Sequence, residues 1–535
     1  MKMTTHVQLP EEVAWPGVVR RFSLLDQGSL RTFALVSILV LGAILRLYHL
    51  SSVPTELDAD EIDLYNSARS IVTTGHDVDG TLLPFLYANT VRNPPIYAAA
   101  GYASSLIFGK TPFGLRFPAV LFGLASIVLI FGITLELTRR RAIALLAALM
   151  MAVAPIFVQF SRIAWEPASE LPFLLAGIYL ALRALRERSP RELIGAALLF
   201  GLTAYTYMAG WFYAAVLGAP LLVIYANRGR SRAAARVTIG AAILWLIVAA
   251  PALWMWFFDP RTSARVHGIA TFSSGISPAT LAIFARNYLA HFRWSYLAVT
   301  GDPISGITWR YLNGFGAFYW WLVPLAALGA LASFHYVRVR ALLLWLGLWV
   351  LAYPLGGALT NEGAPNAPRT LAGAPVFCIM GAIGIVFLFD AAGMLRRRRI
   401  IRTARWILGI GLAAAIGISV VRFARFYFTD YVHQNSNAWD SGTRALFETI
   451  LADQSRYRRV CFLIRPASYE LDSYIRFYLA GSRLQTIDDI EDPRCSLPGT
   501  MLAIDNDHPM TQPGFRQIAR IVDVDGNGFA ELYAR

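Results

Sequence analysis

The feature that most constrains the fold is a series of long apolar runs. A helix needs about 20 mainly apolar residues to cross the hydrocarbon core of a bilayer, and about eleven stretches meet this criterion. They cover residues 33–50, 117–137, 142–159, 171–185, 193–208, 211–226, 237–256, 315–335, 341–357, 370–390 and 406–424. The composition agrees, because 56% of the 535 residues are hydrophobic and only 15% are charged. The sequence therefore predicts a polytopic α-helical membrane protein.

The formal net charge of +14 is concentrated in short arginine tracts between the apolar runs. The tracts lie at residues 139–141, 183–191, 228–236 and 396–405, with Arg338 and Arg340 as a weaker fifth. Basic residues in short loops are typical of the cytoplasmic side, so the charge does not indicate a nucleic-acid partner. If residues 1–31 are also cytoplasmic, about eleven spans in the cytoplasmic (inner) membrane place the C-terminus outside. The first run is long and starts late, as in an uncleaved anchor.

One apolar segment, residues 94–109, is excluded from the spans. It begins with two prolines and is short for a span. If it crossed the membrane, the tract 139–141 would lie outside and the orientation of every later loop would invert. We therefore expect a juxtamembrane helix on the outer face, within one external loop over residues 51–116. Residues 161–170, 257–314 and 355–369 are predicted to face the same side.

From about residue 425 the chain becomes polar and its hydrophobic pattern changes. Residues 460–464, 501–504, 521–524 and 529–533 are typical of strands, and residues 469–479 of a helix. We therefore predict three parts: a cytoplasmic segment 1–31, a transmembrane domain 32–424, and a small extracytoplasmic α/β domain 425–535. Cys461 and Cys495 share this last domain, and their pairing is left open; Cys378 falls in a span as a core thiol.

Two kinds of site are not supported by the motifs. The segment 523–531 begins like a calcium loop, but the twelfth position is Ala534, where a bidentate glutamate is needed. A hairpin turn between two strands explains its Gly, Asn and Asp residues better. The histidines show no metal-ligand spacing and there is no phosphate-binding P-loop. Direct use of a nucleotide is therefore not predicted.

A cluster of carboxylates at residues 56–63 follows the first span by about ten residues. Carboxylates held at a membrane surface indicate a functional site. The same side carries Glu166 and the arginines Arg92, Arg116, Arg162 and Arg369. A carboxylate can remove a proton from a hydroxyl, and guanidinium groups can stabilise a phosphate leaving group. Transfer of a sugar from a lipid phosphate needs both.

The order of motifs resembles the polytopic C-superfamily glycosyltransferases, in particular the protein mannosyltransferase and lipid A aminoarabinose transferase group. The resemblance covers about residues 33–425. It rests on Asp60-Glu61, on Thr74-Gly75-His76-Asp77 through Gly80 to Pro84, on Pro94-Pro95-Ile96-Tyr97, on Phe113-Gly114 with Arg116 and Pro118, on Ser161-Arg162-Ile163 with Glu166, and on Asn366 to Arg369. The relatives commonly carry a basic residue directly before Pro-Pro, where this chain has Asn93 preceded by Arg92.

The resemblance implies roles for these residues. Asp60 would be the general base and Glu61 the second catalytic carboxylate, which either orients partners of Asp60 or binds a divalent cation, Mg²⁺ or Mn²⁺. Arg92, Tyr97, Arg116, Arg162, Glu166 and Arg369 would bind substrate. Simpler roles compete: helix capping for Asp58 and Asp63, the opening of a helix for Glu166, and interfacial snorkelling for Arg369.

Two classes of function follow. The favoured one is a glycosyltransferase that takes a sugar from a polyprenyl-phosphate donor, with inversion, and gives it to a lipid, glycan or protein acceptor outside the membrane. The alternative is a transporter of lipid-linked sugar or polysaccharide. A transporter should carry ionisable residues within its spans, and these spans have almost none.

Overall fold

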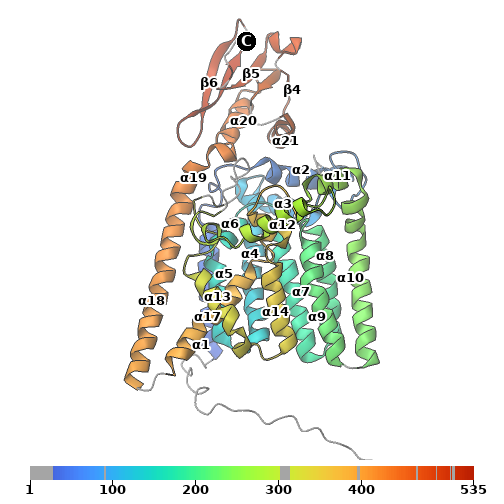
Figure 1. Ribbon diagram of the computed structural model, residues 1–535. Coiled ribbons are helices and arrows are strands. Elements are labelled where there is room, and N and C mark those ends of the chain that lie inside the picture. The colour runs from blue at the N-terminus through green and yellow to red at the C-terminus, as the bar shows by residue number, and fades with distance from the viewer. Residues whose placement is uncertain are drawn as a thin grey trace, which may run out of the picture.

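A computed structural model describes residues 28–88, 92–229, 231–301, 312, 314–394, 398–464, 468–489, 491–506, 508 and 513–535. Upright helices form a bundle, and a small α/β domain sits on one end of it (Figure 1). We call this the capped end and the opposite one the arginine-rich end. Each of the predicted apolar runs falls on a helix of the bundle.

The bundle helices overlap the predicted runs, although several limits differ: α13 begins at Leu322 where the run begins at 315, and α18 begins at Arg398 where the run begins at 406. They are α1 Gly28–Leu47, α4 Pro112–Thr138, α5 Arg141–Val153, α7 Pro167–Glu187, α8 Pro190–Leu202, α9 Gly210–Gly229, α10 Arg232–Phe258, α13 Leu322–Tyr336, α14 Arg340–Ala352, α17 Pro375–Ala392 and α18 Arg398–Arg425. Among the described residues, seven helices are long and apolar enough to cross a membrane, and three shorter ones are apolar. The membrane-protein fold is confirmed; the number of spans stays a prediction.

Arginines at the arginine-rich end form ion pairs between the helix ends. The Glu136 carboxylate at the end of α4 forms ion pairs with Arg139 at 2.9 Å and with Arg186 of α7 at 2.6 Å. Arg140 reaches Asp390 of α17 at 2.8 Å. These partly exposed pairs contribute little stability each, but they gather the arginine tracts on the face opposite the α/β domain (Figure 1).

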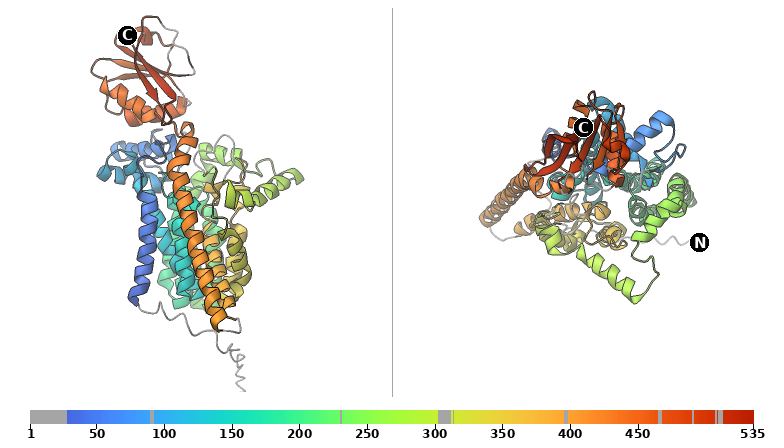
Figure 2. Two further views of the ribbon diagram at one scale, coloured as in Figure 1. Left: turned by 90° about the vertical axis from the view of Figure 1, so that its left-hand side faces the viewer. Right: turned by 90° about the horizontal axis from the view of Figure 1, so that it is seen from above.

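Short helices lie across the capped end. They are α2 Ala59–Thr74, α3 Pro95–Phe108, α6 Pro155–Phe160, α11 Pro260–Ile269, α12 Pro278–Ala290, α15 Leu355–Ala358 and α16 Ala367–Thr370. The segment 94–109 thus forms α3 beside α2 at the end of the bundle, as expected for a juxtamembrane helix (Figure 2). Strands β1 Tyr87–Ala88 and β2 Arg92–Asn93 form a small hairpin between α2 and α3.

The C-terminal domain follows α18 through a π-helical turn Phe426–Asp430 and α19 Tyr431–Gln434. Its sheet has the order β4-β3-β5-β7-β6, with β3 Arg459–Leu463, β4 Gln485–Ile487, β5 Thr500–Asp505, β6 Arg516–Val522 and β7 Gly528–Ala534. Helices α20 Thr443–Ala452 and α21 Ser468–Tyr478 pack beside it. The structure contains the Cys461–Cys495 disulfide. The hairpin turn predicted at residues 523–528 is confirmed, since Asp523 Oδ1 accepts from the backbone N–H groups of Asp525 and Asn527, both at 2.8 Å.

The C-terminal domain shares a hydrophobic core with α2 and α3. Tyr65 of α2 and Phe477 of α21 meet edge to face with ring centroids 5.2 Å apart. The side-chain amide of Asn66 donates to the carbonyl of Ser473 at 3.0 Å. The Lys110 ammonium lies 4.5 Å from the centre of the Phe477 ring. The domain is therefore seated directly on the helix that carries the acidic cluster.

Candidate functional site

The acidic cluster forms the N-terminus of α2. Asp58 is the N-cap, and its carboxylate accepts from the Asp60 N–H at 3.0 Å. The Asp58 N–H in turn donates to Glu61 Oε2 at 3.0 Å, which completes a capping box. This geometry turns Glu61 into the protein, whereas Asp60 stays partly exposed. The simpler role expected for Asp58, helix capping, is confirmed.

Glu61 and Arg116 form a buried pair beneath α2. Arg116 Nε donates to Glu61 Oε1 at 2.9 Å, and Arg116 Nη2 donates to Oε2 at 2.8 Å. Glu61 Oε1 also accepts from the Ala164 N–H at 2.7 Å. Together with the Asp58 N–H, these bonds use both oxygens twice. A carboxylate so saturated holds elements together and has little capacity left for a substrate.

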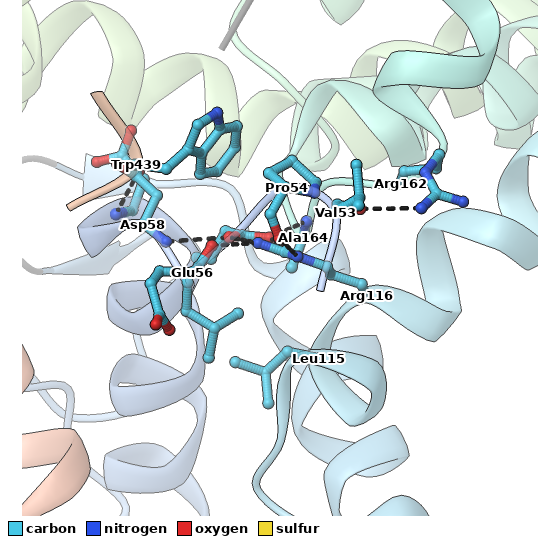
Figure 3. A network of polar contacts seen from close by, with 12 residues as sticks. Val53, Pro54, Glu56, Asp58, Leu115, Arg116, Arg162, Ala164 and Trp439 are labelled. Carbon is cyan, nitrogen blue, oxygen red and sulfur yellow. Dashed lines mark hydrogen bonds and ion pairs between the residues drawn. The ribbon is translucent and has the colours of Figure 1, made fainter. Parts of the chain in front are cut away.

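The remaining donors of Arg116 bind the loop before α2. Nη1 donates to the carbonyl of Pro54 at 2.8 Å and Nη2 also contacts the carbonyl of Glu56 (Figure 3). The guanidinium lies 5.7 Å from the ring of Trp439, at the entry to the C-terminal domain. Arg116 therefore links α4 to the loop 54–61.

Arg162 also uses its donors within the chain. Nη1 donates to the carbonyls of Leu45 and Arg46 at 3.0 and 2.7 Å, where α1 ends, and Nη2 donates to Val53 at 2.9 Å (Figure 3). Cations are favoured at helix C-termini, where carbonyl groups lack intrahelical partners. The guanidinium also lies 4.9 Å from the ring of Phe428. Arg162 therefore links the end of α1 to the π-helical turn that follows α18.

Three further predicted residues have different surroundings. Tyr97 is buried and donates its hydroxyl to the carbonyl of Leu115 at 3.1 Å, joining α3 to α4. Glu166 is buried where α7 begins, directly before Pro167. The backbone of Arg92 lies in β2 opposite Ala88, and its side chain is outside the described residues.

Arg369 lines an apolar cavity of about 250 Å³. Much of the wall is aromatic, from Trp211, Phe212, Trp256, Phe257 and Phe272. Within the described chain, Arg369 is the one charged residue of the lining. Its Nη2 contacts the carboxylate of Glu362, whereas Nη1 has no hydrogen-bond partner among the described residues. A buried, half-paired guanidinium at the end of an apolar cavity is suited to an anion with a hydrocarbon tail.

The turn that carries Arg369 is held from two sides. The buried His291 ring accepts from the Asn366 N–H through Nε2 at 2.9 Å, and its Nδ1 donates to the carbonyl of Asn287 at 2.7 Å. Burial lowers the pKa of His291 to about 4, so the ring is neutral near pH 7. On the other side, a Cβ at Gly356 would lie 2.0 Å from the carbonyl oxygen of Arg369. Only glycine permits this approach.

The cavity and the acidic cluster are joined by the turn 161–166. Ala164 binds Glu61 through its N–H, and the next residue, Trp165, packs its ring 6.3 Å from that of Tyr207. Met208 then lines the cavity. The loop between α2 and α3 reaches the same wall, because buried Leu86 packs in one cluster with Trp256. A series of contacts therefore connects the start of α2 with the wall of the cavity that Arg369 lines.

The sequence did not single out several residues of this site. Glu362 lies within the predicted external turn 355–369, and its charge is the feature of the sequence that could have marked it as a residue of the site. His291 and Tyr474 act on backbone groups of distant loops, which no local pattern reveals. Glu170, one turn after Glu166 on α7, is fully buried, and neither carboxylate oxygen has a hydrogen-bond partner in the described chain.

The predicted metal role of Glu61 does not fit the structure. Both of its oxygens are already bound by Arg116 and by backbone N–H groups. Among the described residues, no group of three or more His, Cys, Asp or Glu side chains is arranged to hold a metal ion.

The architecture matches solved glycosyltransferases. ArnT from Cupriavidus metallidurans bound to undecaprenyl phosphate superposes with a TM-score of 0.57 at 12% identity, over 95% of this chain and 98% of that chain. The same protein in the apo state gives 0.56 at 13% identity, over 94% and 97%. The Archaeoglobus fulgidus oligosaccharyltransferase in the apo form gives 0.53 at 15% identity, over 89% and 67%.

The sequence comparison agrees with the fold. Residues 92–256 match the family model described as dolichyl-phosphate-mannose-protein mannosyltransferase. No curated protein matches the chain by sequence. The resemblance drawn from the motifs is confirmed by the structural and family comparisons. The chain is thus a polytopic membrane protein with the GT-C glycosyltransferase fold, and residues 92–256 carry the sequence pattern of the mannosyltransferase family.

Proposed function

We propose that the chain is an integral-membrane glycosyltransferase that moves a sugar from a polyprenyl-phosphate donor to an acceptor hydroxyl outside the cytoplasmic membrane. The observation that carries this proposal is the pairing of the aromatic cavity with Arg369. A polyprenyl-phosphate sugar has a long apolar chain and one anionic group. The cavity offers apolar walls and a guanidinium with an unpaired Nη1, which match these two parts.

Asp60 is the proposed general base. It is partly exposed at the first turn of α2, with its backbone fixed by the Asp58 cap. The acceptor hydroxyl loses its proton to the Asp60 carboxylate while its oxygen forms a bond to the anomeric carbon of the donor. The bond from that carbon to the phosphate oxygen breaks, and the electron pair leaves with the polyprenyl phosphate. Attack opposite the leaving group inverts the anomeric configuration.

Arginine side chains divide into two groups in this mechanism. Arg369 stabilises the negative charge that develops on the leaving phosphate. Arg92 is the proposed second phosphate ligand: its backbone pairs with Ala88, two residues after Leu86, which packs against the cavity wall. Arg116 and Arg162 have a different assignment, since their donors bind Glu61 and backbone carbonyls. They hold the site, as does Tyr97.

In this proposal Glu61 does not react with substrate; it holds in place the first turn of α2, which carries Asp60. Its bonds to Arg116, Ala164 and Asp58 tie the start of α2 to α4 and to the turn before α7. Glu166, buried at the end of that turn, is the proposed positioning group for the acceptor.

The substitution Asp60→Asn tests the base. It keeps the shape and removes the proton acceptor, so transfer should fall about a hundredfold or more while donor lipid still binds. Asp58→Asn is the matched control, because asparagine is also a good N-cap, and its effect should be mild. Near-normal transfer by Asp60→Asn together with loss in Asp58→Asn would shift the assignment to Asp58. Normal transfer in both variants would place the general base outside the acidic cluster.

The donor sugar and the acceptor are found by mass spectrometry of membrane glycolipids and glycans from cells with and without the gene. A single pentose or hexose missing from one glycan would name both.

A further inference from the structure

The Arg369 guanidinium is bound differently from the other buried arginines. Arg116 and Arg162 spread their donors over fully buried acceptors within the chain. Arg369 is 5% exposed, yet its ion pair is to Glu362, whose side chain is 35% exposed at the edge of the site. One guanidinium nitrogen, Nη1, remains without a partner in the described chain.

The carboxylate of Glu362 is presented by a short turn with fixed ends. The Asn361 N–H donates to the carbonyl of Ile269 at 2.7 Å, and the Asn366 N–H is bound by His291 at 2.9 Å. Ile269 itself lines the cavity. The backbone thus keeps Glu362 beside Arg369, while its partly exposed side chain can rotate away into solvent.

A counter-ion is needed here because an unpaired buried charge is expensive. Removing one partner of a buried ion pair typically costs several kcal/mol. The same guanidinium is the proposed ligand of the donor phosphate, and a phosphate would supply the missing anion. Glu362 and a lipid phosphate therefore compete for the positive charge of the same guanidinium group.

We propose that Glu362 is an exchangeable counter-ion of Arg369, which a lipid phosphate displaces on binding and which returns when the lipid product leaves. This inference rests on the proposed function, since it takes Arg369 as the phosphate ligand. The product, a phosphate monoester, carries about 1.5 to 2 negative charges near pH 7. An arginine without a competing carboxylate would retain such an anion. Glu362 weakens this retention and so favours release of polyprenyl phosphate.

The test measures binding of undecaprenyl phosphate to the full-length protein in nanodiscs. Glu362→Gln removes the competing charge and keeps the shape, so this lipid should bind about tenfold more tightly, equivalent to about 1.4 kcal/mol. Binding of undecaprenol, which has the same chain and no phosphate, should not change. A merely structural effect on the cavity would alter both lipids alike. Glu448→Gln, an exposed glutamate of α20, is the matched control and should bind both lipids like the wild type.

The outcomes separate this inference from the proposed function. Arg369→Ala should lose phosphate-dependent binding. If it does, and Glu362→Gln binds undecaprenyl phosphate like the wild type, the counter-ion role is refuted and the proposed phosphate site stands. If Arg369→Ala binds both lipids like the wild type, the phosphate site itself is wrong. Should Glu362→Gln fail to fold, Glu362→Asp decides, because its shorter side chain weakens the ion pair and should tighten binding in the same direction.

Discussion

The hydroxyl of Tyr474, in the C-terminal domain, lies 3.3 Å from the backbone carbonyl oxygen of Leu57. Leu57 directly precedes the Asp58 cap, so this contact reaches the loop that presents Asp60. The same hydroxyl lies 3.3 Å from a carboxylate oxygen of Asp440. A residue more than four hundred positions away thus shapes the start of α2.

Tyr474→Phe should lower transfer several-fold and leave binding of undecaprenyl phosphate unchanged. The ring is fully buried and would still pack, so only the polar contacts of the hydroxyl, to Leu57 and to Asp440, are lost. A single hydrogen bond contributes about 0.5–1.5 kcal/mol, and the melting temperature should therefore change little. The comparison is with Tyr478→Phe, one turn along α21, which should behave like the wild type. Equal transfer by both variants would limit Tyr474 to packing.

Glu61→Gln and Glu170→Gln should have opposite effects on stability. Glu61 neutralises the fully buried Arg116, and its loss should cost about 3–5 kcal/mol. Glu170 is equally buried and has no hydrogen-bond partner in the described chain. Replacing it with a neutral side chain of the same shape should leave stability unchanged or raise it. Thermal unfolding of the two purified variants decides, and a strongly destabilised Glu170→Gln would show that its carboxylate has a partner when the protein is in a membrane.

The carboxyl group of Glu56 predicts a pH dependence of stability. Burial raises the pKa of Glu56 from 4.5 to about 7, against the opposing effect of Arg444. The folded chain then binds more protons than the unfolded chain between these pH values, so the free energy of unfolding falls as pH rises from 4.5 to 7. The loss is at most about 3 kcal/mol.

Glu56→Gln should remove this part of the pH dependence. Thermal unfolding at pH 5 and at pH 7.5 gives the measurement, with Glu448→Gln as the control on an exposed carboxylate. If the stability of Glu56→Gln changes between pH 5 and pH 7.5 by as much as that of the wild type, the assignment is contradicted.

Labelling of single cysteines tests the orientation in the membrane. Thr73→Cys on α2 and Ser455→Cys in the C-terminal domain are exposed positions at the capped end, and Arg191→Cys is exposed at the other end. An impermeant thiol reagent added to intact spheroplasts should label the first two and not the third. The native background is low, since Cys378 is buried and Cys461 and Cys495 form a disulfide. Labelling of only Arg191→Cys would invert the predicted topology.

Much of the fold could be predicted because its signals are local. Apolar runs predict helices and arginine tracts predict the loops between them, and each run overlaps a helix of the bundle. The edge strand β6 was expected at residues 521–524 but covers Arg516–Val522, because most of its side chains are exposed and give little apolar alternation. Strand β4 has only three residues, too few to form a pattern.

The site was predicted only in part, for a physical reason. A sequence shows which residues carry a guanidinium group, but the fold determines which hydrogen-bond acceptors lie next to it. Arg116 and Arg162 were expected to bind substrate, and their donors instead meet a buried carboxylate and carbonyls at helix ends and loops. The carbonyl acceptors belong to the backbone, which every residue carries alike, so no residue pattern marks them.

The packing of the C-terminal domain against α2 has a consequence for biosynthesis. Asn66 binds Ser473, 407 positions later in the chain. A ribosome adds about 5–20 residues per second, so α21 is made roughly 20–80 s after α2. During this interval the loop that carries the acidic cluster lacks its contacts to α21. A chain interrupted anywhere before α21 therefore lacks both the Asn66–Ser473 contact and the Tyr474 contact to Leu57, so the loop that carries the acidic cluster is complete only after α21 has been made.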